Sequence, residues 1–252
     1  MTSFRLAGVD VPRVGLGSNR LTTAREHVAF IREAVAAGVR HIDTAHLYTG
    51  GDSEQAIGEA LGGRADGVLV ATKGGYRDGE GAPAVLAAQI EQSLRSLRVE
   101  AIDLYYLHRV DPQTPLEESL GAIKGYVERG AIRHVGISAV TVEQIERARA
   151  IVPIAAVQNS YSLDDREHED VIDHCERAGI AFVPYFPLRG GGAGVTAAAQ
   201  RLGVSENTVK LAWLLARSPV LLPIPGTLSI EHLRENLAAL ELDLGDASQI
   251  AG

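Results

Sequence analysis

The sequence predicts an α/β fold, a single-domain (β/α)8 TIM barrel, and three observations support this prediction. Short β-rich runs alternate with longer helical patterns along the chain. Several of these runs are almost continuously apolar, as parallel strands buried on both faces should be. Eight β–α units in 252 residues match the arithmetic of such a barrel. We therefore assign residues 1–252 to one barrel domain.

The expected strands and helices follow one another in order. Helices are expected between the strands, because apolar residues such as Val28, Ile31 and Val35 recur at helical spacing. The segments 114–117 and 141–144 are typical of capped helix starts, each with Thr at the cap and Glu or Gln in the first turn. Glycines at the expected helix ends are Gly38, Gly130 and Gly179. The expected strands lie near 13–17, 39–44, 67–73, 101–108, 132–138, 154–160, 181–187 and 220–225.

A doubly wound open sheet is the competing architecture, and it would place a glycine fingerprint after its first strand. The early run from Gly15 to Arg20 lacks the third small residue of that fingerprint. A second run, Gly192 to Ala197, fits G-x-G-x-x-A but follows the seventh expected strand. The sequence therefore favours the barrel. A glycine loop that enters a helix can hold a phosphate in either fold.

Composition excludes several classes of protein. The formal net charge of −8 argues against a surface for nucleic acid or anionic membrane. No apolar run reaches the ~18 residues that a membrane span needs, and residues 1–5 do not resemble a signal peptide. Cys175 is the single cysteine, so no intrachain disulfide can form, and its thiol is expected to pack in the core. We expect a cytoplasmic protein.

Four polar residues lie at the carboxyl ends of successive expected strands: Asp43, with Tyr48 in the loop after it, Lys73 and His108. Lys73 is one of three lysines among 24 basic residues, and lysine, unlike arginine, has a pKa that a site can tune. We expect Lys73 to lower the pKa of the Tyr48 phenol and Asp43 to hold Lys73 charged. Tyr48 could then donate a proton to a carbonyl oxygen, which His108 would orient.

Other interpretations of these residues remain. Each side chain alone could be structural: a loop cap, a solvated strand end, a loop aromatic or a surface histidine. His41 and His46, with Asp43 and His108, could suggest a metal site, although no carboxylate-rich cluster completes it. Lys73 could also be the Schiff-base lysine of an aldolase-like barrel.

The sequence resembles the aldo-keto reductases, and the similar stretches occur in the order typical of that family from residue 13 to residue 236. The D-T-A-x-x-Y motif in combination with the strand-end Lys and His is specific. The runs 107–112 and 166–170 look most like the bacterial branch that includes pyridoxal reductases. The matching stretches are 41–48, 71–73, 103–108, 136–138, 157–159, 224–227 and 233–236.

The resemblance implies a role for each matching position. Tyr48 would be the general acid, supported by the other three residues of the tetrad. Ser138 and Gln158 would hold the nicotinamide carboxamide, and Tyr185 would stack on its ring. The remaining cofactor contacts would be Gly17 and Ser18 at the entry, Leu188, Arg189 and Gly190 at the pyrophosphate, and Thr227, His232, Glu235 and Asn236 around the adenosine 2′-phosphate and adenine. The substrate pocket would include Asn19, Arg20, Leu47, Tyr76 and Arg109.

Three features depart from the pattern of the family. Ala139 stands where family members commonly have Asn, so one carboxamide contact is missing. Gly226 and His232 stand where the 2′-phosphate pocket often carries Lys or Arg. Only 16 residues follow Asn236, a region that usually contributes a loop over the substrate.

The resemblance implies an NADPH-dependent reductase of aldehydes or ketones, with NADH as a possible second cofactor and no metal. Tyr48 would donate the proton while hydride is transferred. Its partner would be a small-molecule carbonyl substrate, with no nucleic acid and no membrane. The alternative is a nicotinamide-cofactor-binding module with little or no turnover. The sequence leaves the identity of the carbonyl substrate, the direction of the reaction and the oligomeric state open.

Overall fold

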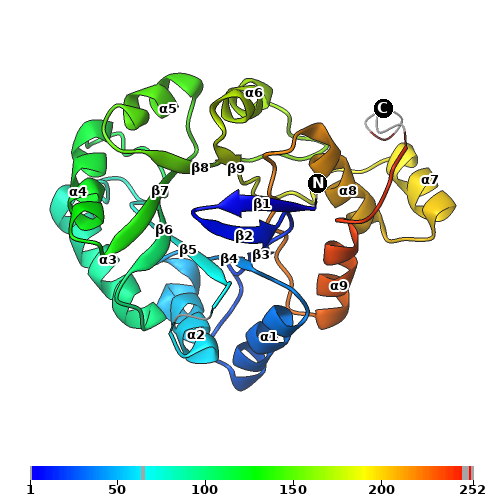
Figure 1. The fold of residues 1–252 in the computed structure, drawn as a ribbon, viewed down its shortest axis with the longest axis horizontal. Coiled ribbons are helices and arrows are strands. Elements are labelled where there is room, and N and C mark those ends of the chain that lie inside the picture. Colours follow the sequence, from blue (N-terminus) through cyan, green and yellow to red (C-terminus); the bar gives the residue numbers. More distant parts are fainter. Residues whose placement is uncertain (1, 64–65, 246–249, 251–252) are drawn as a thin grey trace.

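The computed structural model describes residues 2–63, 66–245 and 250. Seven parallel strands form one sheet in the order of the sequence, and helices surround it as a ring (Figure 1). This arrangement confirms the predicted barrel. The strands are β3 (Leu16–Gly17), β4 (His41–Asp43), β5 (Leu69–Gly74), β6 (Ile102–Leu107), β7 (Ile132–Ser138), β8 (Ile154–Gln158) and β9 (Ala181–Phe182).

The eighth strand, predicted at residues 220–225, closes the barrel without forming a regular strand. On one side the Gly17 N–H donates to the carbonyl of Pro225 (3.2 Å), and on the other the N–H of Phe182 donates into the same segment (2.8 Å). Pro223 and Pro225 have no N–H to return to β3. Half of the hydrogen bonds that would pair this segment with β3 are therefore missing, which explains why the segment is not a regular strand.

Nine α-helices occur in the described residues, and none of these helices is long and apolar enough to cross a membrane. The capping box predicted at 141–144 is confirmed at the start of α5, whereas the one predicted at 114–117 is wrong. Helix α4 begins without a side-chain cap, because the Thr114 hydroxyl donates to Asp111 instead (3.0 Å). The helices are α1 (Arg25–Ala36), α2 (Asp52–Leu61), α3 (Pro83–Leu97), α4 (Leu116–Glu128), α5 (Val142–Arg149), α6 (Glu169–Ala178), α7 (Ala193–Leu202), α8 (Glu206–Arg217) and α9 (Ile230–Ala238).

An antiparallel hairpin that the sequence analysis did not predict lies across the middle of the barrel in Figure 1. Its strands are β1 (Ser3–Leu6) and β2 (Val9–Pro12), joined at a turn in which both Ala7 and Gly8 have positive φ. Apolar residues alternate along both strands, which is the signal that could have revealed it. Leu6 and Val11 pack into the barrel interior and close its N-terminal end.

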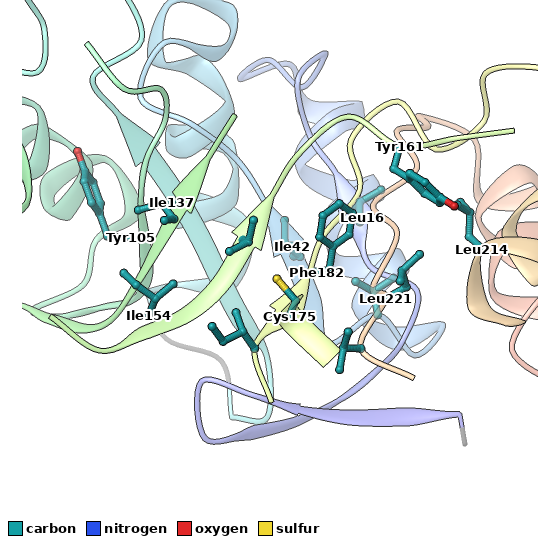
Figure 2. Close-up of a cluster of buried hydrophobic side chains, with 14 of the residues drawn as sticks. Leu16, Ile42, Tyr105, Ile137, Ile154, Tyr161, Cys175, Phe182, Leu214 and Leu221 are labelled. Atoms are coloured by element: carbon teal, nitrogen blue, oxygen red, sulfur yellow. The ribbon is translucent and has the colours of Figure 1, made fainter. Parts of the chain in front are cut away.

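Two apolar clusters fill the molecule. The inner cluster lies inside the barrel, and the outer cluster lies between the strands and the helices. Figure 2 shows part of the outer cluster, including Phe182 of β9 and Leu214 of α8. Cys175 of α6 is fully buried in this cluster, and burial raises the pKa of its thiol to about 12. The expectation that this thiol packs in the core is confirmed.

Arg13 joins the start of the barrel to its end. Its buried guanidinium donates to the carbonyls of Leu221 (3.2 Å), Leu215 (2.8 Å) and Ser218 (2.5 Å). Two of these carbonyls lie at the C-terminal end of α8, where backbone acceptors lack helical partners and the helix dipole favours a cation. Arg13 therefore fixes α8 and the closing segment against β3.

We expect Arg13→Met to lower the free energy of unfolding by about 2–4 kcal/mol, because it leaves buried carbonyls without donors. Chemical denaturation measures this change. Arg149→Met is the matched control, since Arg149 forms an exposed pair with Glu146, and such pairs contribute about 0–1 kcal/mol. Equal stability of the two variants would contradict the role of Arg13.

Candidate active site

The pleat of the strands and their register bring the predicted residues to one end of the barrel. Leu69 and Ala71 face the barrel interior, so Lys73, two residues further along β5, faces inward as well. Asp43 at the end of β4 is paired with Ala71, one pleat below Lys73. His108 directly follows β6, and its N–H donates to the Gly74 carbonyl (2.8 Å). Three strand ends therefore meet at the C-terminal rim.

Lys73 is fully buried, and all its hydrogen-bond partners belong to the site. Its Nζ donates to Asp43 Oδ1 (2.5 Å), to the Thr44 carbonyl (2.7 Å) and to Tyr48 Oη (3.4 Å). Burial alone would lower the pKa of Lys73, but the charge of Asp43 and the hydrogen bonds more than offset it, and the pKa is raised. An ammonium held in this way is a poor Schiff-base nucleophile, which argues against the aldolase-like interpretation.

Tyr48 opens the 3-10 helix η1 (Tyr48–Gly51), which follows β4. Its pKa is raised, because burial of the phenol outweighs the opposing effect of Lys73. The prediction that Lys73 lowers this pKa is therefore wrong for the net direction, although the contribution of Lys73 has the expected sign. The phenol keeps its proton at neutral pH, so it can act as a proton donor.

His108 stands edge-on to Tyr48, with 6.0 Å between ring centroids, and 4.8 Å from the ring of Tyr76. Burial, together with the charge of Lys73, lowers the pKa of His108 to about 2. The imidazole is therefore neutral. Its Nδ1 is buried without a hydrogen-bond partner among the described residues, which leaves Nε2 as the nitrogen that can meet a ligand.

Two neighbouring strands add polar groups beside the tetrad. Ser138 at the end of β7 is paired in register with Gln158 at the end of β8, and both are buried. Gln158 Nε2 donates to Asp43 Oδ2 (2.9 Å), so the amide is joined directly to the ion pair. Asn159 makes two hydrogen bonds with the backbone of Val140 (3.0 and 2.7 Å) and fixes the loop after Ser138. The sequence analysis gave Asn159 no role.

These residues surround a cavity of about 730 Å³, a volume in the usual range of ligand pockets. The ion pair lies at its floor, where Asp43 lines the cavity and Lys73 is covered by the residues around it. The structure brings most of the predicted residues to its wall: Gly17, Ser18, Asn19, Arg20, Asp43, Leu47, Tyr48, Tyr76, His108, Arg109, Ser138, Gln158, Tyr185, Leu188 and Arg189.

Five predicted cofactor residues do not line this cavity: Gly190, Thr227, His232, Glu235 and Asn236. Thr227 follows the cavity residue Gly226, and its hydroxyl accepts from the Ser229 N–H (3.1 Å) just before α9. His232 and Glu235 are exposed on α9, whereas Asn236 is buried. The four later residues therefore lie outside the cavity wall: Thr227 before α9, His232 in its first turn, and Glu235 and Asn236 in its second half.

The cavity wall also contains six residues that the sequence analysis did not assign as contacts. Ala139 and Gly226 were noted there only as departures from the family. The others belong to the run after Tyr185 and the run 224–227, where apolar character alone did not show which residues face the cavity. These residues are Ala139, Phe186, Pro187, Ile224, Pro225 and Gly226.

Three residues of the site are each followed by a residue whose backbone is in the left-handed conformation. Thr49 comes after Tyr48, Ala139 after Ser138, and Phe186 after Tyr185; their φ values are 48°, 56° and 54°. Such values are uncommon for residues other than glycine, and strain of this kind concentrates at functional sites. The backbone thus turns sharply directly after each of these side chains.

The interpretation as a metal site gains no support from the geometry. His41 lies at the start of β4, where it is fully buried, and burial lowers its pKa to about 4. Across the described ranges, no three His, Cys, Asp or Glu side chains are grouped so as to hold a metal ion.

Comparison with known proteins identifies relatives over nearly the whole chain. The sequence profile described as "Aldo/keto reductase family" matches residues 13–197 and 192–251. An uncharacterized oxidoreductase of Schizosaccharomyces pombe is 38% identical, over 96% of this chain and 86% of its own length. Pyridoxine 4-dehydrogenase of Escherichia coli is 37% identical, over 97% of this chain and 94% of its own length, which supports the resemblance to the pyridoxal-reductase branch.

Solved structures agree with these relatives. A thermostable aldo-keto reductase in complex with the inhibitor epalrestat superposes with a TM-score of 0.88 at 31% identity, covering 98% of this chain and 96% of that one. An aldo-keto reductase from Klebsiella pneumoniae in complex with NADPH also gives a TM-score of 0.88, at 29% identity and with 98% and 92% coverage. The predicted fold and the predicted class of enzyme, an oxidoreductase, are confirmed. The chain belongs to the aldo/keto reductase family.

Proposed function

We propose that the protein reduces an aldehyde or ketone to an alcohol with NADPH, and that Tyr48 is the proton donor. One observation carries this proposal: a protonated phenol, a buried ammonium and a neutral imidazole meet at the floor of one cavity. Such a set suits transfer of a proton to an oxygen that becomes negative during the reaction.

The residues present fit a nicotinamide cofactor. Buried polar groups of Ser138 and Gln158 face the cavity beside Tyr185, as a carboxamide and a flat ring require. Gly192 is the N-cap residue of α7, which follows the loop that contains the cavity residues Leu188 and Arg189, and the N–H groups of a first helical turn can hold a phosphate. The Klebsiella pneumoniae relative was solved in complex with NADPH, which supports this assignment.

Each residue of the tetrad has a distinct part in the proposed reaction. The bound cofactor supplies a hydride to the carbonyl carbon. The Tyr48 hydroxyl gives its proton to the carbonyl oxygen, and the ammonium of Lys73, 3.4 Å away, stabilises the phenolate that remains. Asp43 keeps Lys73 charged, and neutral His108 offers a hydrogen bond to the same oxygen without adding charge.

The adenosine end of the cofactor would lie along α9 and the loop before it. We propose that Thr227 of that loop and His232, Glu235 and Asn236 of α9 surround the adenine and the 2′-phosphate. Arg189 stacks on Phe186, 3.9 Å from guanidinium carbon to ring centroid, at the edge of the same cavity. We propose NADPH as the main cofactor and NADH as a weaker one.

We propose one domain over residues 1–252, a cytoplasmic location, a small-molecule carbonyl substrate and no nucleic-acid partner. The net charge of −8 supports the last of these. A binding module without turnover is the second candidate, and Ala139 favours it, because a carboxamide contact of the family is absent there. Such a module would bind NADPH and reduce no carbonyl compound.

We expect purified protein to oxidise NADPH with members of a panel of aldehydes, and Tyr48→Phe to lower kcat by roughly 10²–10⁴-fold, the usual contribution of a general acid. The dissociation constant for NADPH should change little. Tyr126→Phe is the matched control, because that hydroxyl bonds to the Ala87 carbonyl away from the cavity. Equal turnover by both variants would remove Tyr48 from its assigned role.

The rate of reduction should be flat between about pH 6 and pH 9, with saturating NADPH. The pKa of His108 is far below this range, so the ring stays neutral, and the pKa of Tyr48 is raised, so the phenol loses its proton only at higher pH. The rate should therefore fall only on the alkaline side. An ionisation near pH 7 in kcat/KM that disappears in His108→Gln would contradict this prediction.

Ala139→Asn should strengthen NADPH binding by roughly 2- to 12-fold, the range of one added hydrogen bond. Asn tolerates the left-handed backbone of this position and offers an amide to the carboxamide of the cofactor. Ala139→Gly separates the two effects, because glycine relieves the strain without adding an amide. If titration of NADPH shows the same affinity for both variants, the added hydrogen bond is not the cause.

A further inference from the structure

Two aromatic side chains are exposed in the part of the chain that the structure describes, Tyr76 and Phe186, and both line the active-site cavity. Tyr76 is 46% exposed and Phe186 is 49% exposed. A large apolar surface left in water inside a pocket is typical of a surface that a ligand covers. Tyr76 also stands 4.8 Å from the ring of His108, next to the reacting groups.

Tyr76 lies in the loop between β5 and α3, and one carboxylate of that loop holds its backbone. Glu80 Oε2 accepts from the N–H groups of Tyr76 (3.1 Å) and Arg77 (3.0 Å). The N–H of Glu80 in turn donates to the carbonyl of Arg77 (2.9 Å). Residues 76–80 therefore form one compact turn. The orientation of this turn, and with it that of Tyr76, depends on the contacts of the residues next to Glu80.

Asp111, from the loop after β6, holds those residues. Its Oδ1 accepts from the Gly79 N–H (3.1 Å) and its Oδ2 from the Gly81 N–H (2.8 Å). The same two oxygens accept from the Gln113 N–H (2.9 Å) and the Thr114 hydroxyl (3.0 Å) in the loop of Asp111 itself. Asp111 is 5% exposed, so these four bonds are shielded from water.

Packing and charge reinforce this connection between the two loops. A Cβ on Gly81 would lie 2.5 Å from the Cβ of Asp111, so the close approach requires glycine. The carbonyl of Gly81 accepts from the Ser119 hydroxyl of α4 (2.8 Å). At the surface, Arg109 bonds to Asp78 (2.8 Å). The loop that contains Tyr76 is thus fastened to the loop that begins at His108.

We propose that Tyr76 selects substrates that carry a flat ring beside the carbonyl group, and that Asp111 is a positioning residue that holds Tyr76 over His108. This inference rests on the proposed function. A flat ring can stack on Tyr76 while its carbonyl oxygen meets Tyr48 and His108, whereas a puckered saturated ring of the same size makes a poorer contact. Substrate selection therefore depends on a carboxylate that touches neither substrate nor cofactor.

The test compares benzaldehyde with cyclohexanecarbaldehyde, using the full chain and saturating NADPH. Wild type should have a higher kcat/KM for benzaldehyde. Tyr76→Leu should lower the ratio of the two kcat/KM values by roughly 2- to 12-fold, the range of a ring–ring contact. Asp111→Asn should lower it in the same direction, mainly through KM, because an amide presents one acceptor oxygen and two of the four donors lose their partner.

The double variant Tyr76→Leu/Asp111→Asn separates positioning from general loss of structure. If Asp111 acts through Tyr76, the ratio in the double variant equals that in Tyr76→Leu alone, whereas independent effects multiply. Glu117→Gln is the matched control, since this exposed carboxylate of α4 bonds to Arg147 away from both loops. Thr114→Val, which removes one of the four bonds, gives a smaller shift in the same direction and replaces Asp111→Asn if that variant does not fold.

The outcomes are distinct. If wild type oxidises NADPH with members of the aldehyde panel but with neither of these two aldehydes, this inference is overturned alone; if it oxidises NADPH with no member of the panel, the proposed function is overturned as well. Turnover of both aldehydes with an unchanged ratio in Tyr76→Leu would overturn the inference alone. An unchanged ratio in folded Asp111→Asn, or multiplied effects in the double variant, would overturn the positioning role of Asp111.

Discussion

The buried ion pair between Lys73 and Asp43 is the interaction on which the rest of the site depends. Two charged groups that are shielded from solvent are tolerated only when they are paired and hydrogen-bonded. Removal of one partner typically lowers the free energy of unfolding by about 3–5 kcal/mol. Asp43 uses one oxygen for Lys73 and the other for Gln158. Lys73 directs its remaining donors to the Thr44 carbonyl and the Tyr48 hydroxyl. One electrostatic requirement therefore fixes an amide, a carbonyl and a phenol from separate elements.

The barrel provides the place where such a pair can exist. Below it the interior is filled by apolar side chains, and the hairpin closes that end through Leu6 and Val11. Above it lies the cavity. Because inward-facing side chains alternate along each strand, Lys73 is the next inward residue after Ala71. The apolar interior below Lys73 and Asp43 makes an unpaired charge costly, so the two must pair. The cavity above them leaves the Tyr48 phenol accessible to a ligand.

Side-chain hydrogen bonds hold the rim of the cavity, and part of its backbone is strained. Asn159 forms two hydrogen bonds that hold the turn at Ala139, the left-handed residue that directly follows Ser138. Asp111 joins the two loops that carry Tyr76 and His108. Strain and buried hydrogen bonds of this kind are retained when neighbouring structure over-determines them. The hydrogen bonds that orient the side chains toward the cavity therefore also hold its rim in place.

The sequence by itself determined the order of strands and helices, the capping box at 141–144 and the four polar residues that meet at the floor of the cavity, because periodicity, strand ends and caps are local properties. Tertiary structure decided the rest. Thr114 bonds to Asp111 rather than capping α4, and Asp111 finds two of its donors about thirty residues earlier in the chain. The pKa of Tyr48 rises although Lys73 is near, because burial outweighs the charge. The position of Asp111 and the burial of Tyr48 both depend on contacts between residues remote in sequence, which only the folded chain sets.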